Sequence, residues 1–363
     1  MSTLQISGSS LSSDFSIELT GSKSETNRLL LLAALYPNLT LLNDSNAHDV
    51  SVMKKALQLS SGTVDIHHAG TAMRFLTAYF SVTENAEVLL TGSDRMKQRP
   101  IALLVDALRA LGAAIEYRGE EGYPPLHIKG AVLPGSSVSI AANVSSQYLS
   151  ALCLVGAKLP EGIEIELIGS ITSLPYLNMT LQLLERIGIS AKLDNQRIRI
   201  APKSEIEPIS LAVESDWSAA SYYYSVVALS KLGTKATLST LREDSLQGDR
   251  VLSTIYKDFG VSTRFEDGMV ILEKVSGPVS QTLSYDLKDA PDIAQTIAVT
   301  AAGLHVDCFL TGLHTLPIKE TDRLAAMKGE LEKVGASVKI DAESLRVFGQ
   351  KAILQSASIA TYN

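Results

Sequence analysis

Cysteine is scarce in this chain of 363 residues, which carries only Cys153 and Cys308. Both lie in apolar stretches, so we expect two buried free thiols rather than a disulfide or a nucleophile. This use of cysteine is typical of a reducing compartment.

Long apolar runs and targeting signals are also missing. The longest purely apolar run near the N-terminus is Leu29–Tyr36, far shorter than the ~20 residues that a membrane span needs. The first residues, MSTLQISGSS, contain neither a basic start nor an apolar signal segment. We therefore expect a cytoplasmic protein without a membrane partner.

Positive charge is not in excess: 32 Lys and Arg stand against 39 Asp and Glu, a formal net charge of −7. This balance argues against a nucleic-acid partner, although a local basic cluster could still bind a small anion. No Walker loop, GxGxxG after a strand, GxSxG elbow or metal-ligand spacing is present, and the adjacent His67 and His68 lie in a carboxylate-poor segment. We expect no metal, no cofactor and a monomer.

An internal repeat is the first positive feature. Four segments read as a helix, a glycine and a strand, with the glycines 72 to 76 residues apart at Gly112, Gly188, Gly260 and Gly335. Glycine at this position ends a helix in the left-handed conformation. The segments between them predict strands at 137–141, 164–168 and 237–239, and helices at 146–157, 219–229 and 292–302. An earlier copy near Lys54–Ile66 is compressed, with little room for extra strands.

The length and the repeat together predict an α/β (α+β type) protein of two domains. Each repeat unit should run strand, helix, strand, helix and then further strands. A period of this length suits a few copies of one unit grouped into two domains better than it suits a solenoid.

Polar and basic side chains recur where these helices begin, and a helix N-terminus favours anions. In GSKSETNR, Ser22 and Glu25 form a capping box, which places Lys23, Ser24 and Arg28 in the first two turns. Each motif alone is also typical of an ordinary solvated helix start, so only the set is informative.

Six further segments extend the set. HHAGTAMR places Gly70 before a helix, and RMKQRP places Arg95, Lys97 and Arg99 directly before Pro100, a residue that suits a first helical turn. The remaining candidates are Ser145, Ser146 and Gln147; Ser173 and Tyr176; Asp292; and Lys319, Glu320 and Arg323. Trp217, beside the capping Asp216, reads as mainly structural. Together the segments predict a site between two domains for at least one doubly charged anion, with two candidate acid/base carboxylates.

These motifs resemble the EPSP synthase family. GSKSETNR, AGTAMRFL, RMKQRPI, SSQ, SLPY, PDIAQT and KETDR occur in that family's order, and the likeness runs from about Gly21 to the end. The resemblance implies an enolpyruvyl transferase fold of βαβαββ units, with the last unit truncated in this chain. It implies one domain at 21–213, a second at 1–20 plus 214–363 that is incomplete at its C-terminus, and an active site in the cleft between them.

The resemblance also implies a reaction: transfer of the enolpyruvyl group of phosphoenolpyruvate to the 5-hydroxyl of shikimate 3-phosphate, with release of phosphate. Asp292, Glu320 and Lys23 would be catalytic. Shikimate 3-phosphate would contact Ser24, Arg28, Ser145, Ser146, Ser173, Tyr176 and Lys319. Phosphoenolpyruvate would contact Lys23, Gly70, Arg99, Gln147 and Arg323, with glyphosate competing there.

Three departures from the family pattern stand out. His68 occupies a position where the family usually has Asn, the first unit is shortened near Ser60–Val64, and the chain stops at Asn363 where the family continues with Asp-His-Arg and a later Lys. We expect the last departure to weaken binding of phosphoenolpyruvate more than binding of shikimate 3-phosphate. A weakly active or inactive phosphate-binding form is therefore one alternative. A second is the UDP-N-acetylglucosamine enolpyruvyl transferase, which normally uses a Cys on a mobile loop, a setting that fits neither Cys153 nor Cys308.

Overall fold

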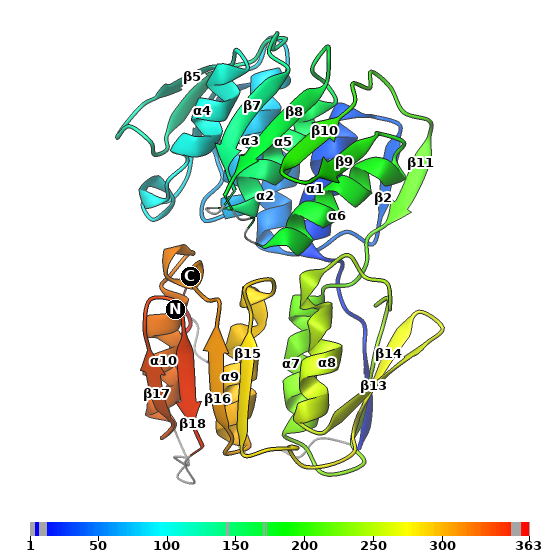
Figure 1. The fold of residues 1–363 in the computed structure, drawn as a ribbon, viewed down its shortest axis with the longest axis vertical. Helices are drawn as coiled ribbons and strands as arrows, with labels where there is room; N and C mark the ends of the chain where they lie inside the picture. The colour runs from blue at the N-terminus through cyan, green and yellow to red at the C-terminus, as the bar shows by residue number, and fades with distance from the viewer. Residues whose placement is uncertain are drawn as a thin grey trace.

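Four four-stranded sheets of one design build most of the molecule. The computed structural model describes residues 4–6, 13–142, 145–169, 171, 173–349 and 357–362. In each of these sheets the first two strands are parallel, and an antiparallel hairpin follows whose second strand lies beside them. Parallel neighbours need a long crossover, which a helix supplies. Figure 1 shows the result as two lobes, one above the other.

Two and a half of these units form the upper lobe. The first full unit contains β3 (Ser61–Asp65), α3 (Gly70–Val82), β4 (Glu87–Thr91), η1 (Met96–Gln98), α4 (Ala102–Ala110), β5 (Ala114–Tyr117) and β6 (Leu126–Lys129). The second contains β7 (Ser137–Ala141), α5 (Ser146–Gly156), β8 (Ile163–Ile168), α6 (Leu174–Arg186), β9 (Ala191–Asp194) and β10 (Arg197–Ile200). The partial unit contains β11 (Ile209–Ala212), α1 (Lys23–Leu35), β2 (Leu39–Leu42) and α2 (His48–Ala56).

Two units form the lower lobe. One contains β1 (Asp14–Ile17), α7 (Trp217–Ala228), β12 (Lys235–Leu238), η2 (Gly248–Val251), α8 (Leu252–Asp258), β13 (Val261–Glu266) and β14 (Met269–Lys274). The other contains β15 (Thr282–Asp286), η3 (Pro291–Ile293), α9 (Ala294–Gly303), β16 (Asp307–Thr311), η4 (Leu316–Ile318), α10 (Arg323–Lys333), β17 (Ser337–Ile340) and β18 (Leu345–Phe348). Strand β1 pairs in parallel with β12, so the whole upper lobe is inserted between β1 and α7.

The repeat predicted from sequence is confirmed at its glycines. Gly112, Gly188, Gly260 and Gly335 follow α4, α6, α8 and α10 with φ angles of 106°, 79°, 81° and 90°. This left-handed backbone is strained for residues with a Cβ. The compressed early copy is also confirmed, since α2 leads directly into β3 and the sheet of β11 and β2 has two strands. The α/β class with repeated βαβαββ units is therefore confirmed.

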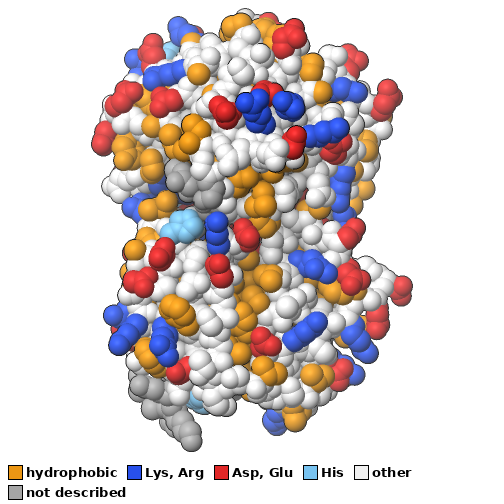
Figure 2. Space-filling model, in the orientation of Figure 1, with side chains coloured by type: hydrophobic (Ala, Val, Ile, Leu, Met, Phe, Trp, Pro, Cys, Tyr) orange, Lys and Arg blue, Asp and Glu red, His pale blue; other side chains and the backbone are white. Residues whose placement is uncertain are grey.

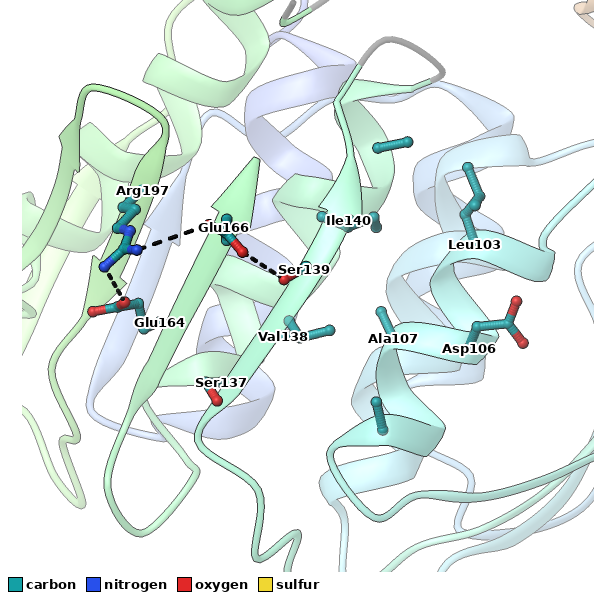
Figure 3. Close-up of a pocket in the computed structure, with 12 residues that line it drawn as sticks. Leu103, Asp106, Ala107, Ser137, Val138, Ser139, Ile140, Glu164, Glu166 and Arg197 are labelled. Atoms are coloured by element: carbon teal, nitrogen blue, oxygen red, sulfur yellow. Dashed lines mark hydrogen bonds and ion pairs between the residues drawn. The ribbon is translucent and has the colours of Figure 1, made fainter. Parts of the chain in front are cut away.

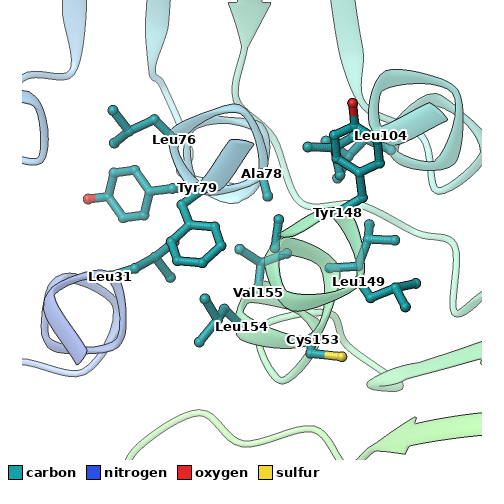
Figure 4. Close-up of a cluster of buried hydrophobic side chains, with 14 of the residues drawn as sticks. Leu31, Leu76, Ala78, Tyr79, Leu104, Tyr148, Leu149, Cys153, Leu154 and Val155 are labelled. Atoms are coloured by element: carbon teal, nitrogen blue, oxygen red, sulfur yellow. The ribbon is translucent and has the colours of Figure 1, made fainter. Parts of the chain in front are cut away.

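Each lobe has its own hydrophobic core. In the upper lobe α3 and α5 pack face to face, and Figure 4 shows Leu76 and Tyr79 from α3 beside Leu154 and Val155 from α5. Cys153 is fully buried here, and burial raises the pKa of its thiol to about 12. Cys308 is equally buried in the lower core, where burial also raises its pKa to about 12. Both thiols are free, as predicted.

Trp217 lies in the lower core, in agreement with the structural role expected from the sequence. Its side chain is fully buried beside Tyr224 and Phe265. The first core runs from Leu29 to Val213, and the second uses Leu19 and residues 217–347. We propose a division at 21–213 and at 1–20 plus 214–363 on this basis.

The surface carries charges of both signs. In the orientation of Figure 1, positive and negative side chains are interspersed over both lobes, and a waist marks the junction between them (Figure 2). No helix in the described part of the chain is both long and apolar enough to cross a membrane.

The chain crosses between the lobes twice, and the two crossings lie side by side. Ser22 N donates to Glu214 O at 2.7 Å, and Asp216 N donates to Thr20 O at 3.1 Å. Glu25 is buried against this crossover, where its Oε2 accepts from Glu214 N at 3.3 Å. Burial, followed by the nearby charge of Glu214, raises the pKa of Glu25 to about 7.

The raised pKa of Glu25 predicts a stability that depends on pH. The folded chain holds this proton more tightly than the unfolded chain, so the free energy of unfolding should fall as pH rises from about 4.5 to about 7. Glu25→Gln should therefore raise the free energy of unfolding by about 1–3 kcal/mol at pH 8, with little gain at pH 4.5. Urea unfolding at the two pH values measures this, with the exposed Glu161→Gln as control. An equal gain at both pH values would contradict the prediction.

Candidate active site

Helix N-termini of both lobes face the junction. In Figure 1 α1 begins where the chain enters the upper lobe, and α7 begins where it returns to the lower lobe. Tyr176, in the first turn of α6, donates its hydroxyl to Asp292 Oδ2 in η3 across the junction at 3.0 Å. Helix N-termini present unpaired N–H groups and partial positive charge. The sequence therefore brings several anion-binding helix starts to one place.

Arg28 lies beneath the upper half of this region, fully inside the lobe. Its guanidinium donates to Thr180 Oγ1 at 2.7 Å, Ser150 Oγ at 3.2 Å, Ser24 O at 2.8 Å and Tyr176 O at 3.2 Å. Burial lowers its pKa to about 10, so the group stays charged at neutral pH. Four of its five N–H groups bind the protein, so Arg28 ties α1 to α5 and α6 and leaves one N–H for a ligand.

The predicted serines stand at the starts of three upper-lobe helices. Ser24 is half-buried in the first turn of α1, and Ser145 is the N-cap of α5, where its side chain accepts from Gln147 N at 3.3 Å. Ser146 is the first residue of α5 and is mostly buried. Ser173 precedes α6 with a φ of 56°, a left-handed conformation in which its side chain makes no cap hydrogen bond. Ser173 therefore does not cap α6 through its side chain.

Gly70 is the first residue of α3, and the guanidinium of Arg99 lies against it. A Cβ at this position would come within 2.4 Å of Arg99 Nη1. Arg74 braces the same corner by donating to Gly70 O at 3.3 Å and to Pro100 O at 3.0 Å. Burial, together with the charge of Arg74, lowers the pKa of Arg99 to about 10, and Arg99 Nη1 is buried without a hydrogen-bond partner. A buried cation with an unused donor is suited to an anionic ligand.

The neighbouring Gln147 side chain is held in place by α3. Its Nε2 donates to Thr71 Oγ1 at 3.3 Å. His68, just before α3, makes a 2.9 Å hydrogen bond between its Nδ1 and Ser93 Oγ. The departure at His68 therefore links the start of α3 to the loop after β4, which carries Arg99.

Asp292 faces the junction from the lower lobe with two cations beside it. Its Oδ1 lies 2.8 Å from Arg323 Nη1 and 3.5 Å from Lys319 Nζ. Burial alone would raise its pKa, but Lys319, Arg323 and Lys23 outweigh burial and hold the pKa of Asp292 well below its usual range. Burial and the charge of Asp292 raise the pKa of Tyr176 well above its ordinary value. Asp292 is thus an ionised carboxylate that accepts a hydrogen bond from the phenol hydroxyl of Tyr176.

Glu320 connects the two lobes through charge. Its Oε2 accepts from Arg323 Nη2 at 3.1 Å, and its Oε1 lies 3.7 Å from Arg99 Nη1 in the upper lobe. Burial would raise its pKa, but Arg323, Arg99 and Lys319 lower the pKa of Glu320 to about 2.

Lys23 is fixed at the crossover. Its backbone N donates to Asp216 Oδ2 at 3.0 Å, and its Nζ lies 3.7 Å from Asp49 Oδ2. It is one of the cations that act on Asp292. All fourteen predicted site residues therefore lie at helix starts or in the adjoining loops, and Tyr176, Asp292, Lys319, Glu320, Arg323 and Arg99 form one connected group.

Two details of the predicted helix starts are wrong. Ser22 does cap α1, but Glu25 does not complete a capping box, because its carboxylate binds Glu214 N instead of Ser22 N. The basic run at Arg95–Arg99 is not the start of α4: a 3₁₀ turn occupies 96–98 and the helix begins at Ala102. The proline after Arg99 ends that turn and leaves the arginine in extended backbone.

Asp249 in η2 is a site neighbour that the sequence did not reveal. Only 3% of it is exposed, Ser218 Oγ donates to its Oδ2, and its Oδ1 is buried without a partner. Burial and the charge of Asp292 raise the pKa of Asp249, and Lys319 opposes them. Its position depends on Gly248, where a Cβ would meet Asp289 O and Pro175 at 2.7 Å and 3.0 Å. Nothing in the local motif signals this packing.

A groove of about 560 Å³ lies elsewhere, between α4 and the outer face of β7 and β8 (Figure 3). Three of its charged side chains are paired: Arg197 lies 3.3 Å from Glu164 and 3.8 Å from Glu166, and Ser139 donates to Glu166 at 2.8 Å. The groove contains none of the predicted site residues. Among the described residues, no group of three or more His, Cys, Asp and Glu side chains could hold a metal ion.

Comparison with known proteins fits this geometry. A family model described as EPSP synthase (3-phosphoshikimate 1-carboxyvinyltransferase) matches residues 39–363. The chain belongs to the EPSP synthase family. A 3-phosphoshikimate 1-carboxyvinyltransferase of Bacteroides fragilis (strain YCH46) is 44% identical, with 88% of this chain and 77% of the relative covered. One from Actinobacillus pleuropneumoniae serotype 5b (strain L20) is 36% identical, with coverages of 96% and 86%.

The same fold occurs in a solved structure. EPSP synthase from Acinetobacter baumannii superposes with a TM-score of 0.72 over 93% of this chain and 82% of that chain, at 18% sequence identity. The family resemblance inferred from the helix-start motifs is therefore confirmed, and so is the two-domain fold that it implied.

Proposed function

We propose that this chain transfers the enolpyruvyl group of phosphoenolpyruvate to the 5-hydroxyl of shikimate 3-phosphate and releases phosphate. Membership of the EPSP synthase family supports the reaction. The observation that carries the assignment of the site is the pairing of groups across the junction, Tyr176 with Asp292 and Arg99 with Glu320. These pairs bring a proton acceptor, a second carboxyl and buried cations together.

Shikimate 3-phosphate is assigned to the upper-lobe helix starts. The N-termini of α1, α5 and α6 supply N–H groups and dipole charge for its phosphate, and Ser24, Ser145, Ser146 and Ser173 supply hydroxyls. Arg28 adds positive charge from beneath with its one uncommitted N–H. Tyr176 and Lys319 would contact the ring, which places the 5-hydroxyl near Asp292.

Phosphoenolpyruvate is assigned to the cations around Gly70. Arg99 offers an unpaired buried donor, Arg323 lies on the far side of Glu320, and Lys23 and Gln147 complete the set. In the unliganded chain Glu320 partly neutralises Arg99 and Arg323. The phosphate and carboxylate of the substrate would take over these cations through stronger, charge-assisted hydrogen bonds.

The same exchange prepares Glu320 for proton transfer. With a pKa of about 2 in the unliganded site, Glu320 is ionised and cannot donate a proton. Bound phosphoenolpyruvate brings negative charge beside it and engages Arg99 and Arg323, and both effects raise the carboxyl pKa. Glu320 then protonates the methylene carbon, which creates a cationic centre.

The remaining steps use the other groups of the site. The 5-hydroxyl attacks the cationic carbon while Asp292 accepts the hydroxyl proton, and a tetrahedral intermediate forms. That intermediate loses a proton from its methyl group to Glu320 and expels phosphate, which restores the carbon–carbon double bond and gives the enol ether product. Lys23 and the arginines stabilise the charge on the leaving phosphate.

Incubation of the chain with both substrates tests the proposal. Release of one phosphate per enol ether, followed by phosphate assay and mass spectrometry, is the expected result. A folded chain that releases no phosphate from the pair would refute it and would leave a phosphate-binding protein as the second candidate. The UDP-N-acetylglucosamine reaction is disfavoured because Cys153 and Cys308 are both fully buried.

We also propose that the chain works as a monomer in the cytoplasm, without nucleic acid. The net charge of −7 supports the last point.

Arg99→Ala should weaken the binding of phosphoenolpyruvate. Loss of one charge-assisted contact costs about 1.5–3 kcal/mol, so the KM of phosphoenolpyruvate should rise roughly 10- to 100-fold. Steady-state kinetics with varied phosphoenolpyruvate measure the change. Arg118→Ala is the matched control, because Arg118 is exposed on the upper lobe and pairs with Glu116 at 3.0 Å. An unchanged KM would remove Arg99 from the site.

Glu320→Gln should act mainly on turnover. The amide keeps the shape of the side chain but cannot give or take the proton, so kcat should fall roughly 10²- to 10⁴-fold. Glu332→Gln, at an exposed position of α10, is the control. Turnover within a factor of two of the unmutated chain would show that Glu320 has no acid/base role.

A further inference from the structure

Three cations lie in the turn at 95–99, and each has a different environment. Arg99 is buried beside Gly70 and faces Glu320. Lys97 is exposed and pairs with Asp94 of the same turn at 3.4 Å. Arg95 reaches into the other lobe, and its role is not explained by the proposed contacts with substrates.

The guanidinium of Arg95 binds the backbone that carries the lower half of the site. Its Nη2 donates to Lys319 O at 3.2 Å and to Pro317 O at 3.5 Å. These carbonyls lie at the end of η4, where Lys319 leaves the 3₁₀ turn in extended backbone. The end of a helical turn exposes carbonyl groups without intrahelical partners, and a planar, charged donor satisfies them well.

The location of Arg95 is electrostatically unfavourable apart from these bonds. Burial is the main cause of the lowered pKa of Arg99, and the charges of Arg74 and Arg95 add to it, so Arg95 and Arg99 repel each other. Its Nε is buried without a hydrogen-bond partner. The carbonyls of Pro317 and Lys319 offset this burial and repulsion, and both belong to the segment that carries the side chains of Lys319 and Glu320.

We propose that Arg95 is a positioning residue that holds the segment 317–320 against the upper lobe. By fixing the carbonyls of Pro317 and Lys319, it sets Glu320 opposite Arg99 and Lys319 opposite Asp292. The loop after β4 thus contacts the lower lobe at two points: Arg95 binds the Lys319 carbonyl, and Arg99 lies beside the Glu320 carboxylate. In Figure 1 this loop extends from the upper lobe toward the orange loop that precedes α10. The effect on turnover rests on the proposed function, whereas the effect on the segment does not.

Arg95→Met and Lys97→Met form a matched pair for the test. Both remove one positive charge from the same turn, so any general loss of attraction for anionic substrates is the same in both. Arg95→Met alone removes the contacts with Pro317 O and Lys319 O.

Hydrogen exchange of the full chain gives a readout that does not need turnover. Amide exchange in the peptide 313–323 should be roughly 10-fold faster in Arg95→Met than in the unmutated chain, and unchanged in Lys97→Met. Equal exchange in the two variants would overturn the proposal, whatever the activity.

Kinetics give the second readout. In Arg95→Met we expect kcat to fall roughly 10- to 100-fold, while the KM of shikimate 3-phosphate stays within about twofold because the upper-lobe contacts are intact. The kcat of Arg95→Lys should lie between those of the unmutated chain and Arg95→Met, because one ammonium group can donate well to only one of the two carbonyls. Equal losses in Arg95→Met and Lys97→Met would overturn the positioning role.

The two proposals fail separately. Faster exchange in Arg95→Met, with no phosphate release even from the unmutated chain, would support the positioning role and refute the proposed function. If Arg95→Met does not fold, Arg95→Lys beside Lys97→Arg takes its place. Faster exchange in Arg95→Lys alone would then support the proposal, and equal exchange would overturn it.

Discussion

Charge pairing between the lobes is the constraint on which the site depends. Each lobe holds charged groups that are costly to leave unpaired: Arg99 is buried in the upper lobe, and Asp292 and Glu320 are partly buried in the lower lobe. An isolated buried ion is strongly unfavourable, and a partner removes much of that cost. Glu320 partly neutralises the charge of Arg99, and Asp292 accepts a hydrogen bond from Tyr176. The two lobes therefore meet where their unsatisfied charges are complementary, and this fixes which helix starts face each other.

The sequence predicted the parts of this arrangement that depend on local rules. The four helix-ending glycines follow from left-handed backbone, and Ser22, Ser145 and Asp216 cap the helices that their motifs indicated. Arg99 and Glu320 were identified as site residues by motif and resemblance, and their 3.7 Å approach is consistent with that prediction. The roles of these residues stay predictions.

The rest could not be predicted because it depends on packing between distant segments. The motif placed Arg28 in the first two turns of a helix but did not predict its burial, which depends on Ser150 and Thr180 of two other helices accepting its hydrogen bonds. Asp249 enters the site because Gly248 lets η2 pass beside Pro175. Glu25 satisfied the capping-box pattern, but Glu214, 189 residues away, took its carboxylate. In each case a long-range partner overrode the local pattern.

The interlobe pairs also bear on how the site responds to its substrates. Lowered pKa values at Asp292 and Glu320 mean that both carboxylates are ionised while the site is empty, and cations produce that state. Anionic substrates compete for the same cations, so binding weakens the hold on the carboxylates. Of the partners of Asp292, Lys23 and Arg323 are assigned to phosphoenolpyruvate, so Asp292 keeps Lys319 and Tyr176 when that substrate binds. Glu320 depends chiefly on Arg323 and Arg99, both assigned to phosphoenolpyruvate. The pKa of Glu320 should therefore rise further than that of Asp292, and this difference separates a proton donor from a proton acceptor within one cluster of like residues.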